Sequence, residues 1–198
     1  MKLIMASNNQ KKLREMQRIL VDMGVEVVPQ REAGCDFEVE ETGKTFAENA
    51  FLKAEAVVRA TGLPAVADDS GLMVDALDGA PGIYSARFTG SHEDSDEARV
   101  QFLLQKLEGV ADRSAKFVSS ICCVFPNGDT LRTEGECPGE IIFAPRGQNG
   151  FGYDPVFRPR GFDRTMAELA PEEKDKISHR GAAMRKFREE LRNYNADK

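Results

Sequence analysis

Residues 116–136, KFVSSICCVFPNGDTLRTEGE, give the clearest local indication of the fold. Residues 116–125 form a mostly apolar run, and Asn127-Gly128 separates them from residues 130–136. An Asn-Gly pair between two such runs is typical of the tight turn of a β-hairpin. The sequence therefore predicts two antiparallel strands in the middle of the chain.

The N-terminal residues predict a strand, a helix and a second strand. Residues 2–6 and 25–29 are short apolar runs typical of buried strands. The segment between them ends at Gly24 and has apolar residues at helical spacing. These residues are Leu13, Met16, Leu20 and Met23. Parallel and antiparallel elements in one chain predict a mixed sheet.

Further helices follow from capping signals and apolar periodicity. Thr45 and Glu48 form a capping box that predicts a helix ending near Gly62. Residues 65–67 predict a brief strand, and Ser95 is expected to open another helix. The remaining expected elements are a strand at 141–143 and a C-terminal helix with the face Met184, Phe187 and Leu191. We predict one α/β domain over residues 1–198, with a mixed sheet, drawn out into two lobes.

Composition restricts the binding partners. The chain has 198 residues, 27 basic and 33 acidic, with a net charge of -6. It therefore lacks the overall positive field that binding to nucleic acid or an anionic membrane would need. An anionic ligand would have to be held by a few placed cations or by a metal ion. The apolar run at residues 3–6 is too short for a signal peptide or a membrane span, so we expect a cytoplasmic protein.

The scarce residues restrict the chemistry. The only histidines are His92 and His179, and the four cysteines form no C-x-x-C pair. Neither a zinc site nor a disulfide framework is indicated, and no G-x-S-x-G nucleophile motif occurs. A metal ion would more readily take oxygen ligands, which favours magnesium, Mg²⁺.

The first candidate segment is the strand-to-helix junction at residues 7–12. Its residues are Ser7, Asn8, Asn9, Gln10, Lys11 and Lys12. Amide groups at a helix N-terminus, with nearby Ser, Asn and Lys donors, could bind an anion. Capping of the helix is the alternative interpretation of Ser7 and Asn9.

The second candidate is Asp68-Asp69, followed by Ser70 and Gly71. Adjacent carboxylates repel each other, so a cation beside them would keep both ionised. One of them could instead take a proton from water. The alternative is a turn in which Asp68 caps backbone amides and Gly71 supplies a positive φ.

The third candidate is the glycine-rich segment 147–155. Glycines around Phe151 would let the backbone approach a flat ligand, and the ring offers a stacking face suited to a nucleobase. A tight loop with aromatic residues in the core is the alternative. Further along, His179 and Arg180 at a helix start could donate to a carbonyl oxygen or a phosphate, whereas residues 171–176 are typical of a solvated helical turn.

These segments, in this order, resemble the noncanonical purine nucleoside triphosphate pyrophosphatases, also called inosine triphosphate pyrophosphatases or XTP/dITP diphosphatases. The shared motifs are Ser7, Asn9 and Lys12; Glu41 to Gly43 with Thr45 to Ala50 and Lys53; Ala67 to Leu72; Ala80 to Arg87; Gly150 to Pro155; and Glu173, Lys174 and Ile177 to Arg180. Two departures are Lys11, where the family often has Gly, and Gln148-Asn149, in place of Thr-Gly.

The resemblance implies an elongated α/β fold with a twisted mixed sheet, two lobes around a nucleotide cleft, and a homodimer. It implies Mg²⁺-dependent hydrolysis of ITP, dITP and XTP to the monophosphate and pyrophosphate, which cleanses the nucleotide pool. Asp69 would activate water and bind the metal with Glu41, and Asp68 would support them. The implied substrate-binding residues are Ser7, Asn8, Asn9, Gln10, Lys11, Lys12, Lys53, Ser70, Phe151, Gly152, Tyr153, Asp154, Lys174, His179 and Arg180.

In this interpretation His179 and Arg180 favour a 6-oxo purine, because the 6-amino group of ATP cannot accept their hydrogen bonds. Two alternatives stay open at the level of sequence. One is a pyrophosphatase acting on dUTP, dTTP or a modified pyrimidine nucleotide. The other is a nucleotide sensor without turnover, which the paired carboxylates at Asp68 and Asp69 argue against.

Overall fold

The structure, a computed structural model, describes residues 1–196, so the last two residues of the predicted 1–198 domain lie outside the described residues. The chain forms two compact units. Unit 1 comprises Met1–Asp69, Ser119–Gly135 and the residues from Arg180 onward, and unit 2 comprises Ser70–Val118 and Glu136–His179.

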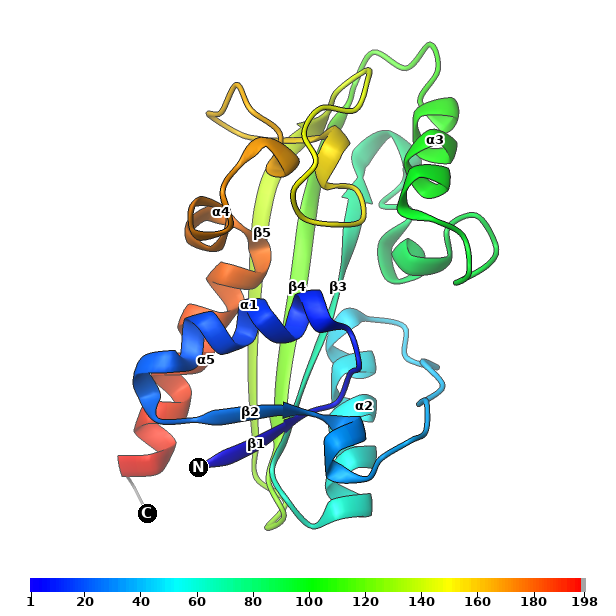
Figure 1. The fold of residues 1–198 in the computed structure, drawn as a ribbon. Coiled ribbons are helices and arrows are strands. Elements are labelled where there is room, and N and C mark those ends of the chain that lie inside the picture. The colour runs from blue at the N-terminus through cyan, green and yellow to red at the C-terminus, as the bar shows by residue number, and fades with distance from the viewer. Residues whose placement is uncertain (197–198) are drawn as a thin grey trace. The chain divides into compact units, whose positions relative to one another are not determined.

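The described strands form a six-stranded sheet in the order β2-β1-β3-β4-β5-β6 (Figure 1). They are β1 (Lys2–Met5), β2 (Glu26–Pro29), β3 (Ala65–Val74), β4 (Ser114–Val124), β5 (Thr130–Ile141) and β6 (Phe157–Pro159). The α-helices are α1 (Gln10–Leu20), α2 (Phe46–Thr61), α3 (Asp96–Lys106), α4 (Pro171–Ile177) and α5 (His179–Ala196). β1 pairs parallel with β2 and β3, whereas β5 pairs antiparallel with β6, which confirms the predicted mixed sheet.

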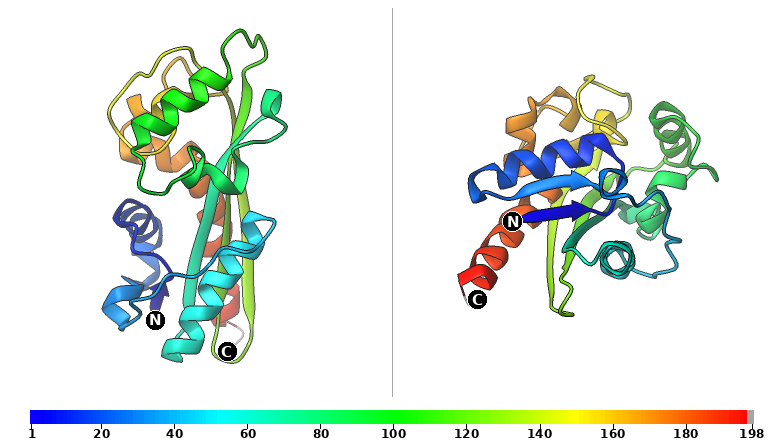
Figure 2. Two further views of the ribbon diagram at one scale, coloured as in Figure 1. Left: turned by 90° about the vertical axis from the view of Figure 1, so that its right-hand side faces the viewer. Right: turned by 60° about the horizontal axis from the view of Figure 1, so that its bottom comes forward.

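Unit 1 has helices on both faces of its part of the sheet, and strand alternation decides which residues meet which helix. Successive side chains of a strand point to opposite faces. Leu3, Met5 and Val66 pack in one core with α1 and α5, whereas Ile4, Ala65 and Ala67 pack in another core with α2. In the left view of Figure 2, α2 (cyan) lies in front of the strands and α5 (red) behind them.

Local signals set the helix ends of unit 1 as expected. Asn9 caps α1 by accepting from the amides of Lys11 and Lys12, and Thr45 caps α2 by accepting from the amide of Glu48. The Glu48 carboxylate accepts from the amide of Lys44, at 2.6 Å, rather than from the capping residue itself. The main chain then turns out of α2 at Gly62, which has φ +66°, a conformation that glycine adopts without steric cost.

β3 differs from the expectation at Asp68–Gly71. The strand does not end at Ala67 but continues through both carboxylates to Val74. Gly71 is not among the residues with positive φ, so the interpretation of Asp68–Gly71 as a turn is wrong. Small and polar residues can continue a strand where both of its faces are covered, and both Asp68 and Asp69 are buried.

The predicted hairpin is present, and one further predicted strand is wrong. β4 and β5 are neighbours in the sheet. In the turn between them the Phe125 amide donates to the main-chain oxygen of Asp129, and the Gly128 amide donates to that of Phe125. The strand expected at residues 141–143 is instead the last residue of β5 followed by a bend. Ile141 is 1% exposed and belongs to the core of unit 2. Phe143 is 79% exposed, and its ring centre lies 4.3 Å from the Arg113 guanidinium, so only the end of this apolar run lies outside the core.

Unit 2 has a core of its own. The end of β3, the start of β4 and the end of β5 contribute apolar side chains. α3 packs against them through Val100 and Leu103, and Leu107 follows at the C-cap of this helix. Tyr153, within the glycine-rich segment 147–155, belongs to the same core. None of the described helices is long and apolar enough to cross a membrane.

Candidate active site

Asp68 and Asp69 face opposite sides of β3, and this separates their partners. Asp68 has the same parity as Val66, which packs with α1 and α5, and Asp69 has the parity of Ala67, which packs with α2. Because alternate strand residues share a face, the two carboxylates enter different surroundings. The mutual repulsion expected from their adjacency is therefore relieved by the strand itself.

The Asp68 carboxylate is bound by three groups within unit 1. Arg180 donates to Oδ2 through Nε and Nη2, at 3.1 and 3.0 Å. Lys12 Nζ lies 2.9 Å from the same oxygen, and the Ser119 hydroxyl donates to Oδ1 at 2.5 Å. Asp68 is 2% exposed, so these donors replace the water that burial removes.

Arg180 is itself part of a buried network of ion pairs. Its Nη1 donates to Glu15 of α1, at 2.5 Å, while the other side of the guanidinium holds Asp68. Arg180 is 2% exposed and Glu15 is 7% exposed. A buried arginine requires paired carboxylates of this kind, and Glu15 is a residue that the sequence analysis did not select.

The electrostatics keep Asp68 ionised. Burial alone would raise the pKa of this carboxyl, but the charges of Arg180 and Lys12 and the bond from Ser119 lower the pKa well below its usual range. The pKa of the Arg180 guanidinium is in turn raised by Asp68 and Glu15, against the effect of burial. Asp68 is thus a permanent anion and a poor proton acceptor.

On the other face, Lys53 brings Asp69 and Glu41 together. The Lys53 ammonium lies 2.7 Å from Asp69 Oδ1 and 2.8 Å from Glu41 Oε1. It also donates to the main-chain oxygen of Asp68, at 3.4 Å. α2 supplies Lys53, β3 supplies Asp69, and the segment before α2 supplies Glu41.

In the cluster of Asp69, Glu41 and Lys53, the surroundings of Asp69 suit a proton acceptor. Burial raises the pKa of Asp69 above its ordinary value, and the lysines offset this only in part. Burial lowers the pKa of Lys53, but Asp69 and Glu41 more than restore it, so the pKa is raised. A carboxylate of raised pKa is a better base than an ordinary surface aspartate, which distinguishes Asp69 from Asp68.

Glu41 and Asp69 are also the residues that could hold a metal ion. Their oxygens converge on one cation, the ammonium of Lys53, and the three side chains carry one negative charge in excess. Among the described residues no group of three or more His, Cys, Asp or Glu side chains forms a closed metal site. Mg²⁺ is commonly bound by one or two carboxylates together with water and substrate phosphates, so this open pair fits it.

Residues 7–12 lie in unit 1 and lead into the N-terminus of α1. The Asn9 side chain accepts from the amides of Lys11 and Lys12, and the Ser7 hydroxyl accepts from the Asn9 amide. The capping interpretation is therefore confirmed for Asn9, whereas Ser7 binds the amide of the capping residue rather than an amide of the helix. Asn8, Gln10 and Lys11 are exposed, and Lys12 reaches Asp68.

The remaining predicted residues lie in unit 2, where a buried ion pair organises the glycine-rich segment. Lys174 Nζ contacts Asp154 Oδ2 at 2.7 Å, and both residues are at most 5% exposed. The same Asp154 oxygen accepts from the Phe151 amide, at 3.0 Å. The Lys174 ammonium also lies 4.9 Å from the centre of the Phe151 ring, so residues 171–176 are more than a solvated helical turn.

Two further residues of unit 2 hold this segment and were not predicted. The Tyr153 hydroxyl donates to the main-chain oxygen of Ser85, at 2.7 Å, and burial raises the pKa of that hydroxyl. The Gly152 amide donates to Asp96 Oδ2, also at 2.7 Å. Ser85 lies in the motif 80–87, whereas Asp96 at the start of α3 had no sequence signal beyond its place in a helical first turn.

His179 and Ser70 complete the predicted set. The His179 ring stacks on Phe117, with ring centres 4.7 Å apart, and His179 is 5% exposed. Ser70 follows Asp69 in β3 and is half-buried. Sequence reasoning could have found Ser119, since it interrupts the apolar strand 116–125, but no local pattern marks Glu15 as the partner of a residue 165 positions later.

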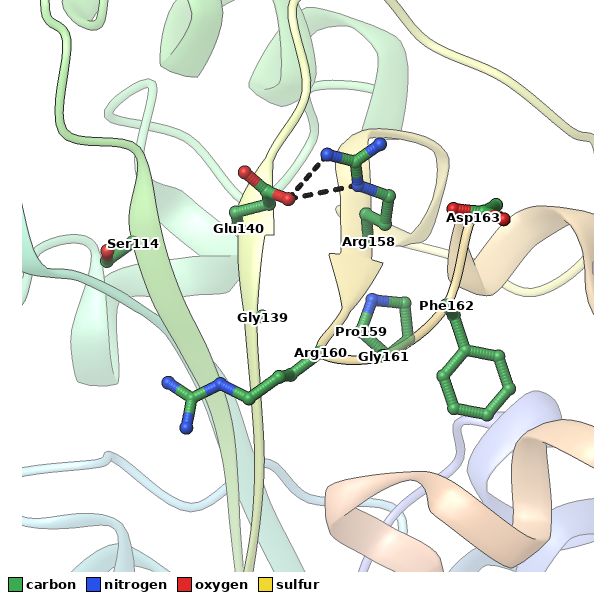
Figure 3. A pocket seen from close by; sticks show the side chains of 9 residues that line it. All are labelled: Ser114, Gly139, Glu140, Arg158, Pro159, Arg160, Gly161, Phe162 and Asp163. Carbon is green, nitrogen blue, oxygen red and sulfur yellow. Dashed lines mark hydrogen bonds and ion pairs between the residues drawn. The ribbon is translucent and has the colours of Figure 1, made fainter.

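A surface pocket of about 510 Å³ in unit 2 contains none of these residues (Figure 3). Glu140 and Arg158 form an ion pair on its wall. Its remaining lining residues are Ser114, Gly139, Pro159, Arg160, Gly161, Phe162 and Asp163. This pocket is not the candidate site.

The structure thus combines a mixed α/β fold with two lysines beside Asp69 and Glu41, an arrangement whose charges suit phosphate groups and a metal ion. The Ham1 family sequence pattern matches residues 3–190. The chain belongs to the Ham1 family, and the resemblance stated from its motifs is thereby confirmed.

Full-length relatives and solved structures agree with this assignment. The chain is 50% identical to the dITP/XTP pyrophosphatase of Aquifex aeolicus over 201 residues, which cover 98% of each chain. The HAM1 protein from Coxiella burnetii matches with a TM-score of 0.90 and 44% identity, over 98% of this chain and 99% of that one. The Ham1 protein of Staphylococcus aureus gives 0.88 and 45%, over 98% and 100%.

Proposed function

We propose that this protein hydrolyses noncanonical purine nucleoside triphosphates, dITP and XTP together with ITP, to the monophosphate and pyrophosphate. The chain is an enzyme, a nucleoside triphosphate pyrophosphatase. The observation that carries the proposal is the cluster of Asp69, Glu41 and Lys53, which combines a basic carboxylate with an open pair of oxygen ligands. The names of the full-length relatives support the choice of substrates.

We assign the chemical step to Asp69. Water attacks the α-phosphorus, the bond to the β-phosphate oxygen breaks, and Asp69 takes the proton of the attacking water. The raised pKa of Asp69 suits this role, and the lowered pKa of Asp68 excludes Asp68 from it. Lys12 and Lys53 hold phosphate oxygens, together with residues 7–11 at the entrance of α1.

Glu41 and Asp69 would hold Mg²⁺. When bound, the ion neutralises phosphate oxygens and the charge that builds on the leaving pyrophosphate. Lys53 already links both carboxylates, so it is placed to move from them to a phosphate oxygen when a cation and substrate enter. Asp68, tied to Arg180 and Glu15, keeps Lys12 in place.

We assign recognition of the base to unit 2. Phe151 offers the stacking ring, and Gly152, Tyr153 and Asp154 shape the segment around it, with Lys174 beneath. His179 and Arg180 stay predicted readers of the 6-oxo group. Arg180 already forms ion pairs with Asp68 and Glu15. It would therefore contact a base through those guanidinium hydrogens that do not bind the two carboxylates.

The decisive experiment is product analysis with dITP and Mg²⁺. We expect dIMP and pyrophosphate in equal amounts, separated by anion-exchange chromatography. Formation of dIDP and phosphate instead would contradict cleavage at the α-phosphorus and with it the role of Asp69.

A substrate panel distinguishes this proposal from a pyrimidine-directed enzyme. We expect kcat/KM to be higher for dITP and XTP than for dTTP, dUTP or ATP. Loss of acceptor groups for buried donors typically costs about 1–3 kcal/mol each, which is roughly a tenfold to hundredfold preference. A preference for dTTP or dUTP would contradict the purine assignment.

We further propose a cytoplasmic homodimer that cleanses the nucleotide pool. Tyr84 and Phe143 of unit 2 are 56% and 79% exposed, and exposed aromatic side chains are enriched at interfaces between subunits. Light scattering of the purified protein tests the dimer, and a monomer at micromolar concentration would contradict it.

A further inference from the structure

Phe151 lies between two glycines that leave its backbone with little conformational restraint of its own. Gly150 and Gly152 have φ values of +75° and +62°, and glycine is the residue with the greatest conformational freedom. A stacking ring on such a segment binds a base well only if contacts elsewhere fix the neighbouring peptides. In the structure, each of these two peptides donates a hydrogen bond to a carboxylate.

The peptide before Phe151 is held by Asp154, and the peptide after it is held by Asp96. The Phe151 amide donates to Asp154 Oδ2 at 3.0 Å, and the Gly152 amide donates to Asp96 Oδ2 at 2.7 Å. Asp154 belongs to the same segment, but Asp96 comes from α3, 56 residues away. Asp96 therefore anchors the segment to a regular element of unit 2.

The Asp96 carboxylate is not needed to cap α3. Ser95 does that, since its hydroxyl accepts from the Ala98 amide at 3.1 Å. Asp96 Oδ1 is oriented instead by Arg99, at 2.7 Å, and Arg99 is fixed by donating to the main-chain oxygens of Asp94 and Ala86. The other oxygen, Oδ2, is thereby aimed at Gly152.

We propose that Asp96 is a positioning residue for the nucleobase, which fixes the orientation of the Phe151 ring through the peptide that joins Phe151 to Gly152. The inference rests on the proposed function, in which Phe151 stacks on the purine. Asp96 touches neither the substrate nor the reacting atoms. Its removal should weaken the binding of a nucleotide through its base and leave the chemical step intact.

The chain offers a matched control. Asp96 and Glu97 both lie in the first turn of α3, so each substitution removes one negative charge from the same helix N-terminus. Glu97 is exposed. For Asp96→Ala we expect KM for dITP to rise about tenfold with kcat within about twofold, because a hydrogen bond to a charged group is lost. For Glu97→Ala we expect no change in either constant.

Asp96→Asn leaves one acceptor oxygen where the carboxylate has two, one for Arg99 and one for the Gly152 amide. We therefore expect its KM to rise, but by less than that of Asp96→Ala. Asp96→Glu keeps the charge but displaces the carboxylate by one methylene, so KM should rise although the helix terminus is unaltered. This variant tests the inference even if Asp96→Ala does not fold.

Two readouts separate positioning from a general structural role. Inhibition by inorganic tripolyphosphate, which has no base, should be the same in Asp96→Ala and in the unchanged protein. Hydrogen exchange of the Gly152 amide, followed by NMR, should be faster in Asp96→Ala and unaltered in Glu97→Ala.

Three outcomes would overturn the inference. They are an unchanged KM in Asp96→Ala, a loss of kcat equal to the rise in KM, or an equal loss of tripolyphosphate inhibition. Phe151→Ala shows which proposal has failed. If Phe151→Ala raises KM and Asp96→Ala does not, the positioning role alone is wrong; if Phe151→Ala has no effect on KM, the proposed base recognition is wrong as well.

Discussion

At the scale of single residues, the two adjacent aspartates have different partners because successive side chains of a strand point to opposite faces of the sheet. Asp68 meets Arg180, Lys12 and Ser119, and Asp69 meets Lys53. One carboxyl has a pKa well below its usual range and the other has a raised pKa. Neighbouring titratable groups with divergent pKa values are a common sign of divided catalytic roles.

Asp69→Asn should abolish most turnover without unfolding the protein. The amide cannot take a proton from water, and loss of a general base typically lowers kcat by about 10²–10⁴-fold. Steady-state kinetics with dITP would measure this, and circular dichroism would confirm the fold. Full activity in this variant would contradict the assignment of Asp69 as the base.

Phe151→Ala should weaken substrate binding with little loss of stability. The ring is half-buried and belongs to none of the three buried cores, whereas stacking on a base contributes about 1–3 kcal/mol. We expect KM for dITP to rise roughly tenfold or more, with the melting temperature within a few degrees. A large fall in melting temperature would favour the alternative in which Phe151 serves the core.

At the scale of elements, residues of α2 hold the main chain at Gly43 and Lys44, just after Glu41. The Gly43 amide donates to the buried Asn49 side chain at 2.8 Å, and the Lys44 amide donates to Glu48 at 2.6 Å. A Cβ at Gly43 would lie 2.6 Å from Asn49 Oδ1. The short motif from Glu41 to Asn49 is therefore a packing requirement as well as a chemical one.

Thr45→Ala should destabilise the protein by about 1 kcal/mol, because the hydroxyl accepts from the Glu48 amide and a lost N-cap typically costs this much. Urea unfolding would measure the change in the free energy of unfolding. Arg59→Ala is the control on the same helix, since its ion pair with Glu55 is exposed, and such pairs contribute little. Equal effects of the two substitutions would contradict the capping role.

Sequence patterns predicted most elements and few of the contacts between them. Apolar periodicity and capping residues located α1, α2 and α3, and the Asn127-Gly128 pair located the β4–β5 hairpin, because these signals act within a few residues. The error at Asp68–Gly71 arose because polar residues were taken to end a strand, whereas burial on both faces carries β3 onward. The partnership of Arg180 with Glu15 and Asp68 depends on tertiary packing, which no local pattern encodes.

At the scale of the whole molecule, a net charge of -6 is compatible with an anionic ligand because a few lysines are held at fixed positions. Lys12 and Lys53 in unit 1 and Lys174 in unit 2 are buried or half-buried beside carboxylates. The cations predicted to hold a nucleotide are thus already placed by ion pairs. Placement of this kind lowers the entropic cost of ordering long side chains on binding.

Removal of divalent cations should abolish turnover and leave the fold intact. Without a metal ion, the Lys53 ammonium contacts both carboxylates and balances one of the two negative charges of Glu41 and Asp69, so we expect the fold to persist. We expect EDTA to lower activity more than about 100-fold and Mg²⁺ to restore it, with an unaltered circular dichroism spectrum. Turnover that persists in excess EDTA would contradict the metal assignment.

Because the cysteines are buried, their reactivity with thiol reagents reports local unfolding of the protein. Cys35, Cys122 and Cys123 lie in unit 1 and Cys137 lies in unit 2, all at most 5% exposed. Burial raises the pKa of the Cys137 thiol to about 11 and raises that of Cys123 further. Thiol reagents should therefore modify the native enzyme slowly, and mass spectrometry of the first labelled cysteine would show which unit opens first under denaturing stress.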